Sequence, residues 1–140
     1  MYDEILVPTD GSPEAEAAVE HAVDIAATYG ARIHALYVVD TSPYATLDAT
    51  ETVVEDLEDE GEDAVEYVTT AAADAGVEAR STITNGNVHE AITTYARAND
   101  IDLIVMGTHG RRGLGRVLVG SVTERVVRTA DVPVLTVRSG

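Results

Sequence analysis

The stretch IDLIVMGTHGRRGLGRVLVGSVTE, residues Ile101 to Glu124, has the most informative pattern in this sequence. Its first seven residues are almost wholly apolar, which is typical of a strand buried on both faces of a parallel sheet. A segment rich in glycine and arginine follows. The spacing of Ser121 and Glu124 then predicts a capping box at the start of a helix. A buried strand, a basic loop and a capped helix in this order predict an α/β protein.

The same alternation of apolar runs and helical segments extends along the whole chain. Ser12 followed by Pro13 is typical of a helix N-terminus, and Gly30 is typical of a helix end. Apolar runs predict strands over Glu4 to Asp10 (which includes a turn at its end), Arg32 to Val39, Val77 to Ile83, Ile101 to Gly107 and Val132 to Val137. Helices are expected over Pro13 to Tyr29, Leu47 to Ala75 and Asn87 to Ala98, and from Ser121 onward.

The character of each strand predicts its place in the sheet. The third strand alternates apolar and polar residues, and the fifth contains Pro133, which cannot donate to a ladder, so both belong at edges. With right-handed crossovers, this predicts an open five-stranded parallel sheet in the order 3-2-1-4-5, Rossmann-like, with helices on both faces and one domain over residues 1–140. Ligands of such sheets bind where the strand order reverses. Here that place is flanked by Pro8 to Pro13 and by Gly107 to Ser121.

The chain carries a strong negative charge. Asp and Glu number 25 against nine basic residues, all of them Arg, and the formal net charge is −16. Such a surface repels nucleic acid and anionic membranes, so neither is expected as a partner. Salt screens the self-repulsion, which favours a salt-rich cytoplasm, as in halophilic microbes; an acidic mesophilic protein is the alternative. The N-terminus has no signal-peptide layout, and we expect a cytoplasmic protein. Without Lys or Cys, a P-loop lysine, a Schiff base and a thiol nucleophile are excluded.

The glycine-rich segment has the chemistry of a phosphate cradle. Gly107 and Gly110 are expected to adopt positive φ and to let backbone N–H groups approach a ligand. Gly120 and Ser121 lie at a predicted helix N-terminus, where free N–H groups and the helix dipole favour phosphate. The basic side chains that could add to the site are His109, Arg111, Arg112 and Arg116. The alternative is a flexible surface loop whose basic side chains are solvated.

The spacing Gly107-x2-Gly110-x9-Gly120-Ser121 resembles the nucleotide-binding signature of the universal stress protein family. The segments VPTDGS, residues 7–12, and GSVTERVVRTADVPVLTV, residues 120–137, are also similar to that family. The resemblance covers essentially the whole chain. It implies a five-stranded α/β fold, homodimers and, in the branch that carries this signature, ATP binding.

The resemblance also implies roles for single residues. Pro8 would line the site, Asp10 would face the nucleotide and its ribose, and Val38 would contact adenine. For Asp10, a role limited to supporting the turn is equally open. The phosphate loop would begin at Met106 and Gly107, and phosphates would be held by Gly110, Gly120, Ser121 and Val122. Relatives often carry Pro near Val88, and this departure concerns only the start of the third helix.

The resulting hypothesis is an ATP-binding stress-response protein that acts as a dimeric nucleotide sensor or regulator. A slow ATPase and a nucleotide-independent interaction module are the alternatives. Any metal would be Mg²⁺ or Mn²⁺ that arrives with the phosphates, with Asp10 as the nearest carboxylate. We expect a homodimer through the edge strand Val132 to Val137, because an uncovered apolar edge invites aggregation. The alternative is an edge that Pro133 alone protects.

Overall fold

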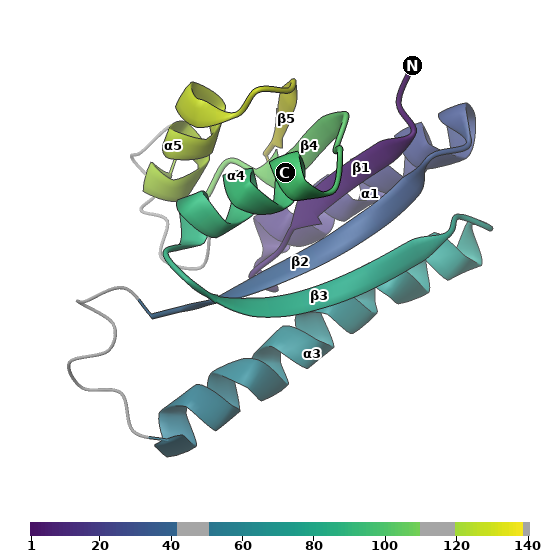
Figure 1. Ribbon diagram of the computed structural model, residues 1–140. Coiled ribbons are helices and arrows are strands. Elements are labelled where there is room, and N and C mark those ends of the chain that lie inside the picture. The colour runs from purple at the N-terminus through teal and green to yellow at the C-terminus, as the bar shows by residue number, and fades with distance from the viewer. Residues whose placement is uncertain (42–50, 110–119, 139–140) are drawn as a thin grey trace.

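The computed structural model describes residues 1–41, 51–109 and 120–138 (Figure 1). Five strands alternate with four helices in this part of the chain. In chain order they are β1 (Glu4–Pro8), α1 (Pro13–Tyr29), β2 (Arg32–Asp40), α3 (Glu51–Asp74), β3 (Ala79–Gly86), α4 (Val88–Ala98), β4 (Leu103–Gly107), α5 (Ser121–Thr129) and β5 (Val134–Val137). Within the described ranges, no helix is long and apolar enough to cross a membrane.

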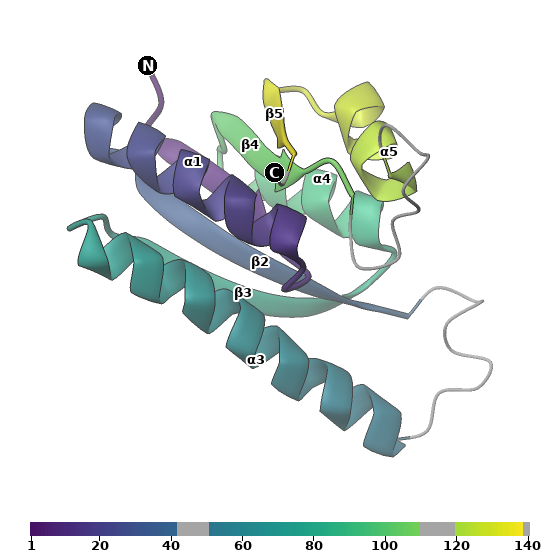
Figure 2. The same ribbon diagram turned by 180° about the vertical axis from the view of Figure 1, so that it is seen from behind.

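The strands form one parallel sheet in the order β3-β2-β1-β4-β5, which confirms the predicted order. Helices α1 and α3 cover one face, and α4 and α5 cover the other (Figures 1 and 2). The order reverses between β1 and β4, whose register pairs Ile5 with Leu103. The carboxyl ends of these two strands lead into α1 and toward α5, so the two flanking segments come to the same edge of the sheet.

Each face of the sheet has its own apolar core, because side chains of a strand alternate between faces. Ile5 and Val7 of β1 belong to the core under α1 and α3, whereas Leu6 belongs to the core under α4 and α5. Val68 of α3 and Val126 of α5 are fully buried in the respective cores. The sheet is thus covered on both faces, as the apolar runs predicted.

The ends of the first and third predicted helices are confirmed. The Ser12 hydroxyl accepts a hydrogen bond from the Ala15 N–H at 3.2 Å and caps α1. Gly30 ends this helix in the left-handed region, with φ 71°. The Asn87 side chain accepts from the Glu90 N–H at 3.4 Å and caps α4. These local signals were sufficient because each cap bonds a backbone group only three residues away.

Strand boundaries differ from the predicted ones by up to three residues, because helix ends and strand starts share apolar residues. The Val77 N–H donates to the Ala72 carbonyl and the Ile101 N–H to the Ala96 carbonyl, so both residues complete helix ends instead of starting strands. Pro133 lies just before β5, and its carbonyl accepts from the Ile104 N–H. It therefore guides the edge strand into place without interrupting it.

Gly61 in the middle of α3 has a packing reason. A Cβ at this position would lie 2.6 Å from Cδ1 of Tyr37, a residue of β2 that is buried on this face. Glycine costs a helix about 1 kcal/mol relative to alanine. Here it lets the helix approach the sheet closely enough to cover the Tyr37 ring.

Candidate functional site

The turn between β1 and α1 forms one wall of the edge where the strand order reverses. The Asp10 carboxylate accepts a hydrogen bond from the Ser12 N–H at 2.9 Å. The Thr9 hydroxyl accepts from the Gly11 N–H at 3.1 Å, and Gly11 has φ 78°, which favours glycine. Asp10 therefore supports the turn, and Pro8 lies buried at the end of β1 just before it. The contact of Asp10 with a nucleotide stays a prediction.

The N-terminus of α5 forms the opposite wall. Gly120 is its N-cap residue and Ser121 is its first helical residue. The predicted capping box at Ser121 is therefore wrong: Gly120 has no side chain, and no side chain within the described ranges caps this end. The N–H groups of a first helical turn lack partners inside the helix, so those of Ser121 and Val122 can be directed at an anion.

Two hydrogen bonds fix this N-terminus to the end of β4, and a third joins the end of β4 to β5. The Gly120 N–H donates to the Thr108 carbonyl at 2.6 Å, and the Thr108 N–H donates to the Val137 carbonyl at 3.0 Å. The Thr123 hydroxyl donates to the Gly107 carbonyl at 2.9 Å, in a buried position. The end of β4, the end of β5 and the first turn of α5 are thus joined at Thr108 and Gly107.

Gly107 does not have the conformation that the sequence suggested. Its φ lies outside the positive range, in which the described glycines are Gly11, Gly30, Gly76 and Gly86. The reason for glycine is space: a Cβ would lie 2.8 Å from the Glu14 Cβ and 2.9 Å from the Glu14 carbonyl carbon. Gly107 therefore allows the first turn of α1 to pack directly against the end of β4.

Apolar side chains at this edge gather on the face covered by α4 and α5. Met106 is buried in the core of that face, and Val38 and Val122 are partly buried against it. Val88 packs on the same core, and sequence reasoning did not place it near the site. It is the first residue of α4, a position that tolerates proline.

The remaining predicted site residues are only partly described. His109 is half-buried, and its Nδ1 lies 3.2 Å from the Thr108 hydroxyl. The predicted roles of Gly110, Arg111 and Arg112 fall on the segment 110–119, which lies outside the described residues. Within the described ranges, no three His, Asp or Glu side chains gather as a metal site would require.

Two shallow hollows lie on the side of the molecule that α1 and α3 cover, and both are lined by acidic residues. The smaller one, about 210 Å³, borders Thr9 and Gly11 and is lined by the carboxyl groups of Glu16, Glu60 and Asp63. A larger one of about 470 Å³ continues along α3. Carboxylates repel phosphate, so an anionic ligand is better suited to the α5 side of the edge.

Tyr67 lies on the surface that the two hollows share. Burial raises the pKa of its phenol above the ordinary value of 10.0, and the nearby charges of Glu16 and Glu20 raise this pKa further. The residue as a whole remains substantially exposed, at 43%. Tyr67 is therefore a neutral, amphipathic side chain within an acidic surface.

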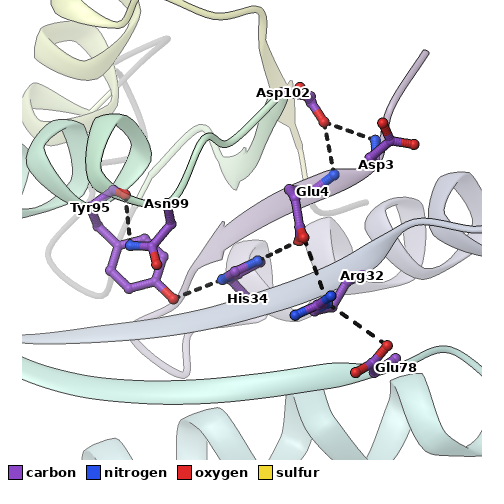
Figure 3. A network of polar contacts seen from close by, with 8 residues as sticks. All are labelled: Asp3, Glu4, Arg32, His34, Glu78, Tyr95, Asn99 and Asp102. Carbon is purple, nitrogen blue, oxygen red and sulfur yellow. Dashed lines mark hydrogen bonds and ion pairs between the residues drawn. The ribbon is translucent and has the colours of Figure 1, made fainter.

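A polar network occupies the other end of the sheet (Figure 3). His34 of β2 is 2% exposed; its Nε2 lies 2.7 Å from a carboxylate oxygen of Glu4, and its Nδ1 lies 2.8 Å from the Tyr95 hydroxyl. Arg32 extends the network through ion pairs with Glu4 at 3.6 Å and Glu78 at 3.8 Å. The network joins β1, β2 and α4 at the amino ends of the strands, away from the candidate site.

Comparisons with known proteins agree with this fold. The model of the universal stress protein family matches residues 1–138. A universal stress protein of Methanocaldococcus jannaschii is 41% identical over 141 aligned positions, which cover 99% of this chain and 83% of the relative. The solved structure of universal stress protein UspA from Lactobacillus plantarum is 37% identical, with a TM-score of 0.86 and 98% of each chain covered.

A further similar structure was solved with a small ligand. It is a universal stress protein in complex with cAMP, 26% identical to this chain, with a TM-score of 0.75 and 99% of both chains covered. The match of the family model over nearly all residues, together with relatives well above 30% identity, leaves one assignment. This chain belongs to the universal stress protein family.

Proposed function

We propose that this protein binds an adenine nucleotide, with ATP as the expected ligand, at the edge of the sheet between β1 and β4. The observation that carries the proposal is the first turn of α5. Its N-cap residue is a glycine, which has no side chain to bond the free N–H groups, and the turn is held beside the end of β4. Such a helix end binds phosphate through N–H groups and the helix dipole. The similar universal stress protein solved with cAMP supports an adenine nucleotide as the ligand class.

The base and the ribose would lie on the apolar side of this edge. Val38 is only partly buried against the core under α4 and α5. An adenine ring over it would remove apolar surface from water. Asp10 is half-buried in the neighbouring turn, and we propose that its carboxylate also faces the ribose.

The phosphates would lie at the start of α5. The N–H groups of Ser121 and Val122 would donate to them, and the Ser121 hydroxyl, which is not needed as a cap, would add a donor. Further contacts with the phosphates would come from the intervening segment, through Gly110, Arg111 and Arg112, and from His109 at its beginning. Mg²⁺ or Mn²⁺ would be held mainly by the phosphates and water.

We also propose that the protein works as a homodimer and signals nucleotide levels to a partner protein. Strand β5 lies at the edge of the sheet, and its Leu135 is 37% exposed. Pairing with the same strand of a second copy would cover this edge. Thr108 supports a link between the two functions, because its N–H bonds Val137 of β5 and its carbonyl bonds Gly120 of the cradle.

The test begins with protein purified at about 2 M KCl, which screens the acidic surface. Any nucleotide released by denaturation is identified, and the emptied protein is titrated with ATP and Mg²⁺. Gly120→Val should abolish saturable binding, because its side chain would cover the helix N-terminus. Ala130→Val is the matched control, since Ala130 has a similar extended backbone at the other end of α5, with φ −68° and ψ 142°.

The outcomes separate the candidate functions. Binding that Gly120→Val removes and Ala130→Val retains supports the nucleotide site. A folded protein that carries and binds no nucleotide would favour the interaction module. Sustained ATP turnover that disappears in Gly120→Val would favour a slow ATPase.

A further inference from the structure

Thr123 makes a side-chain bond that joins two separate parts of the chain. Its hydroxyl donates to the Gly107 carbonyl at 2.9 Å across 16 residues of sequence, and Thr123 is 3% exposed. By contrast, the threonine hydroxyls at two other helical positions bond a carbonyl of their own helix. Thr129 at the far end of α5 bonds the Arg125 carbonyl, and Thr93 of α4 bonds the His89 and Glu90 carbonyls. The Thr123 hydroxyl therefore holds the helix against the strand.

The acceptor of this bond is itself rigidly placed. Gly107 ends β4, where it is opposite Val137 in the register of β5. On its other side it packs so closely on Glu14 that a Cβ could not be accommodated. A hydrogen bond to this carbonyl therefore fixes the position of the first turn of α5 relative to both the sheet and α1.

The donor lies within the turn whose N–H groups are proposed to bind phosphate. Thr123 is the third residue of α5, directly after Ser121 and Val122. Its branched Cβ restricts the side chain to few rotamers, so the bond constrains the direction of the helix axis as well as its distance from β4. The Gly120 N–H bond to Thr108 is the second attachment of the same turn.

We infer that Thr123 is a positioning residue of the nucleotide site: its hydroxyl aims the N–H groups at the start of α5 toward the phosphates. The inference rests on the proposed function. The inference predicts different effects on ligands with and without phosphates. The Thr123 bond orients the phosphate-binding groups, whereas the surface around Val38 does not depend on it. Loss of the hydroxyl should weaken binding of ATP much more than binding of adenosine.

The experiment compares ATP and adenosine by calorimetric titration of the full chain. Thr123→Val keeps the shape of the side chain and leaves the buried Gly107 carbonyl without this donor. We expect its affinity for ATP to fall about tenfold, because loss of a buried hydrogen bond has a free-energy effect of this order. The affinity for adenosine should stay within about twofold. Thr123→Ser, which restores the hydroxyl, should recover most of the affinity for ATP.

Thr93→Val is the matched control, because Thr93 is a threonine of similar burial, 6% exposed, whose hydroxyl bonds carbonyls of its own helix. It should leave the ratio of ATP to adenosine affinity unchanged. If Thr123→Val does not fold, Thr123→Ala removes the hydroxyl without placing a methyl group against the carbonyl, and the same ratio is measured.

The failures are distinguishable. Wild-type protein that binds neither ligand overturns the proposed function and the positioning role with it. Wild-type protein that binds ATP, with an unchanged ratio in the Thr123 variants, overturns the positioning role alone. An equal loss for both ligands would also overturn it, because a general loosening of the fold would then explain the effect.

Discussion

Gly107 and Glu14 lie in direct contact: a Cβ on Gly107 would be 2.8 Å from the Glu14 Cβ. This contact joins the end of β4 to the first turn of α1, the two elements that flank the reversal of strand order. The first glycine of the nucleotide signature is therefore required by the packing of the protein itself. We therefore predict that this glycine acts on a ligand indirectly, through the position of the carbonyl that Thr123 contacts.

Gly107→Ala should lower the free energy of unfolding by about 1–3 kcal/mol, because the added methyl group forces α1 away from β4. Chemical denaturation of the protein without nucleotide measures this change. Unchanged stability together with lost ATP binding would contradict the packing explanation and return this glycine to the ligand.

Gly61→Ala should destabilise the protein, although alanine is the better helix former by about 1 kcal/mol. The new methyl group would lie 2.6 Å from Cδ1 of the buried Tyr37 ring. In a Tyr37→Leu background the same substitution should be neutral or stabilising, because the ring is gone. A double-mutant cycle by urea denaturation measures the coupling. Stabilisation by Gly61→Ala in the wild-type background would contradict this prediction.

Tyr95→Phe should cost about 1–3 kcal/mol of stability, because it leaves Nδ1 of the buried His34 without its hydroxyl partner. Tyr67→Phe removes a hydroxyl from a residue that is 43% exposed and should have little effect at neutral pH. Thermal and chemical unfolding of the two variants measure the difference. Equal stabilities would mean that the network in Figure 3 does not stabilise the fold.

Tyr67 should titrate above pH 10.0, because burial and then the charges of Glu16 and Glu20 raise its pKa. Its phenolate forms more easily in the unfolded chain, so stability that is complete below pH 10 declines as the pH rises through the raised pKa. Tyr67→Phe should lose less stability over this range. Ultraviolet difference titration of the wild type against the variant gives the midpoint, and a midpoint at or below 10 would refute the prediction.

Salt should stabilise this protein, because its net charge of −16 repels itself. We expect the free energy of unfolding to rise between about 0.1 M and 1 M KCl, as the Debye length falls from roughly 10 Å to 3 Å. Glu58, Glu62 and Glu66 are exposed along α3. Their combined replacement by Gln should stabilise the protein at low salt and much less at high salt. A salt-independent stability would argue against adaptation to a salt-rich cytoplasm.

Neighbouring residues were sufficient to predict the N-caps of α1 and α4, but the predicted N-cap of α5 was wrong. Ser12 and Asn87 cap their helices through backbone groups three residues away, which neighbouring residues alone specify. At α5, both Gly120 and Ser121 were acceptable N-cap residues. The choice was made by the bond from the Gly120 N–H to Thr108, which belongs to the end of another element.

Sequence patterns alone were sufficient to predict the architecture and the edge at which a ligand site is expected. The character of the strands placed β3 and β5 at the edges, and the reversal of order between β1 and β4 followed from chain connectivity. Such patterns are periodic along the chain and need no knowledge of distant residues.

The roles of individual residues at this edge depend on contacts that form when the chain folds. The contact of Gly107 with Glu14, the bond of Thr123 to Gly107 and the burial of His34 between Glu4 and Tyr95 each join segments far apart in sequence. Their existence depends on the register of the strands and on how closely each helix packs, which no local pattern specifies. The same glycine or threonine can serve a ligand or the fold, and the neighbour that packing brings to it makes the difference.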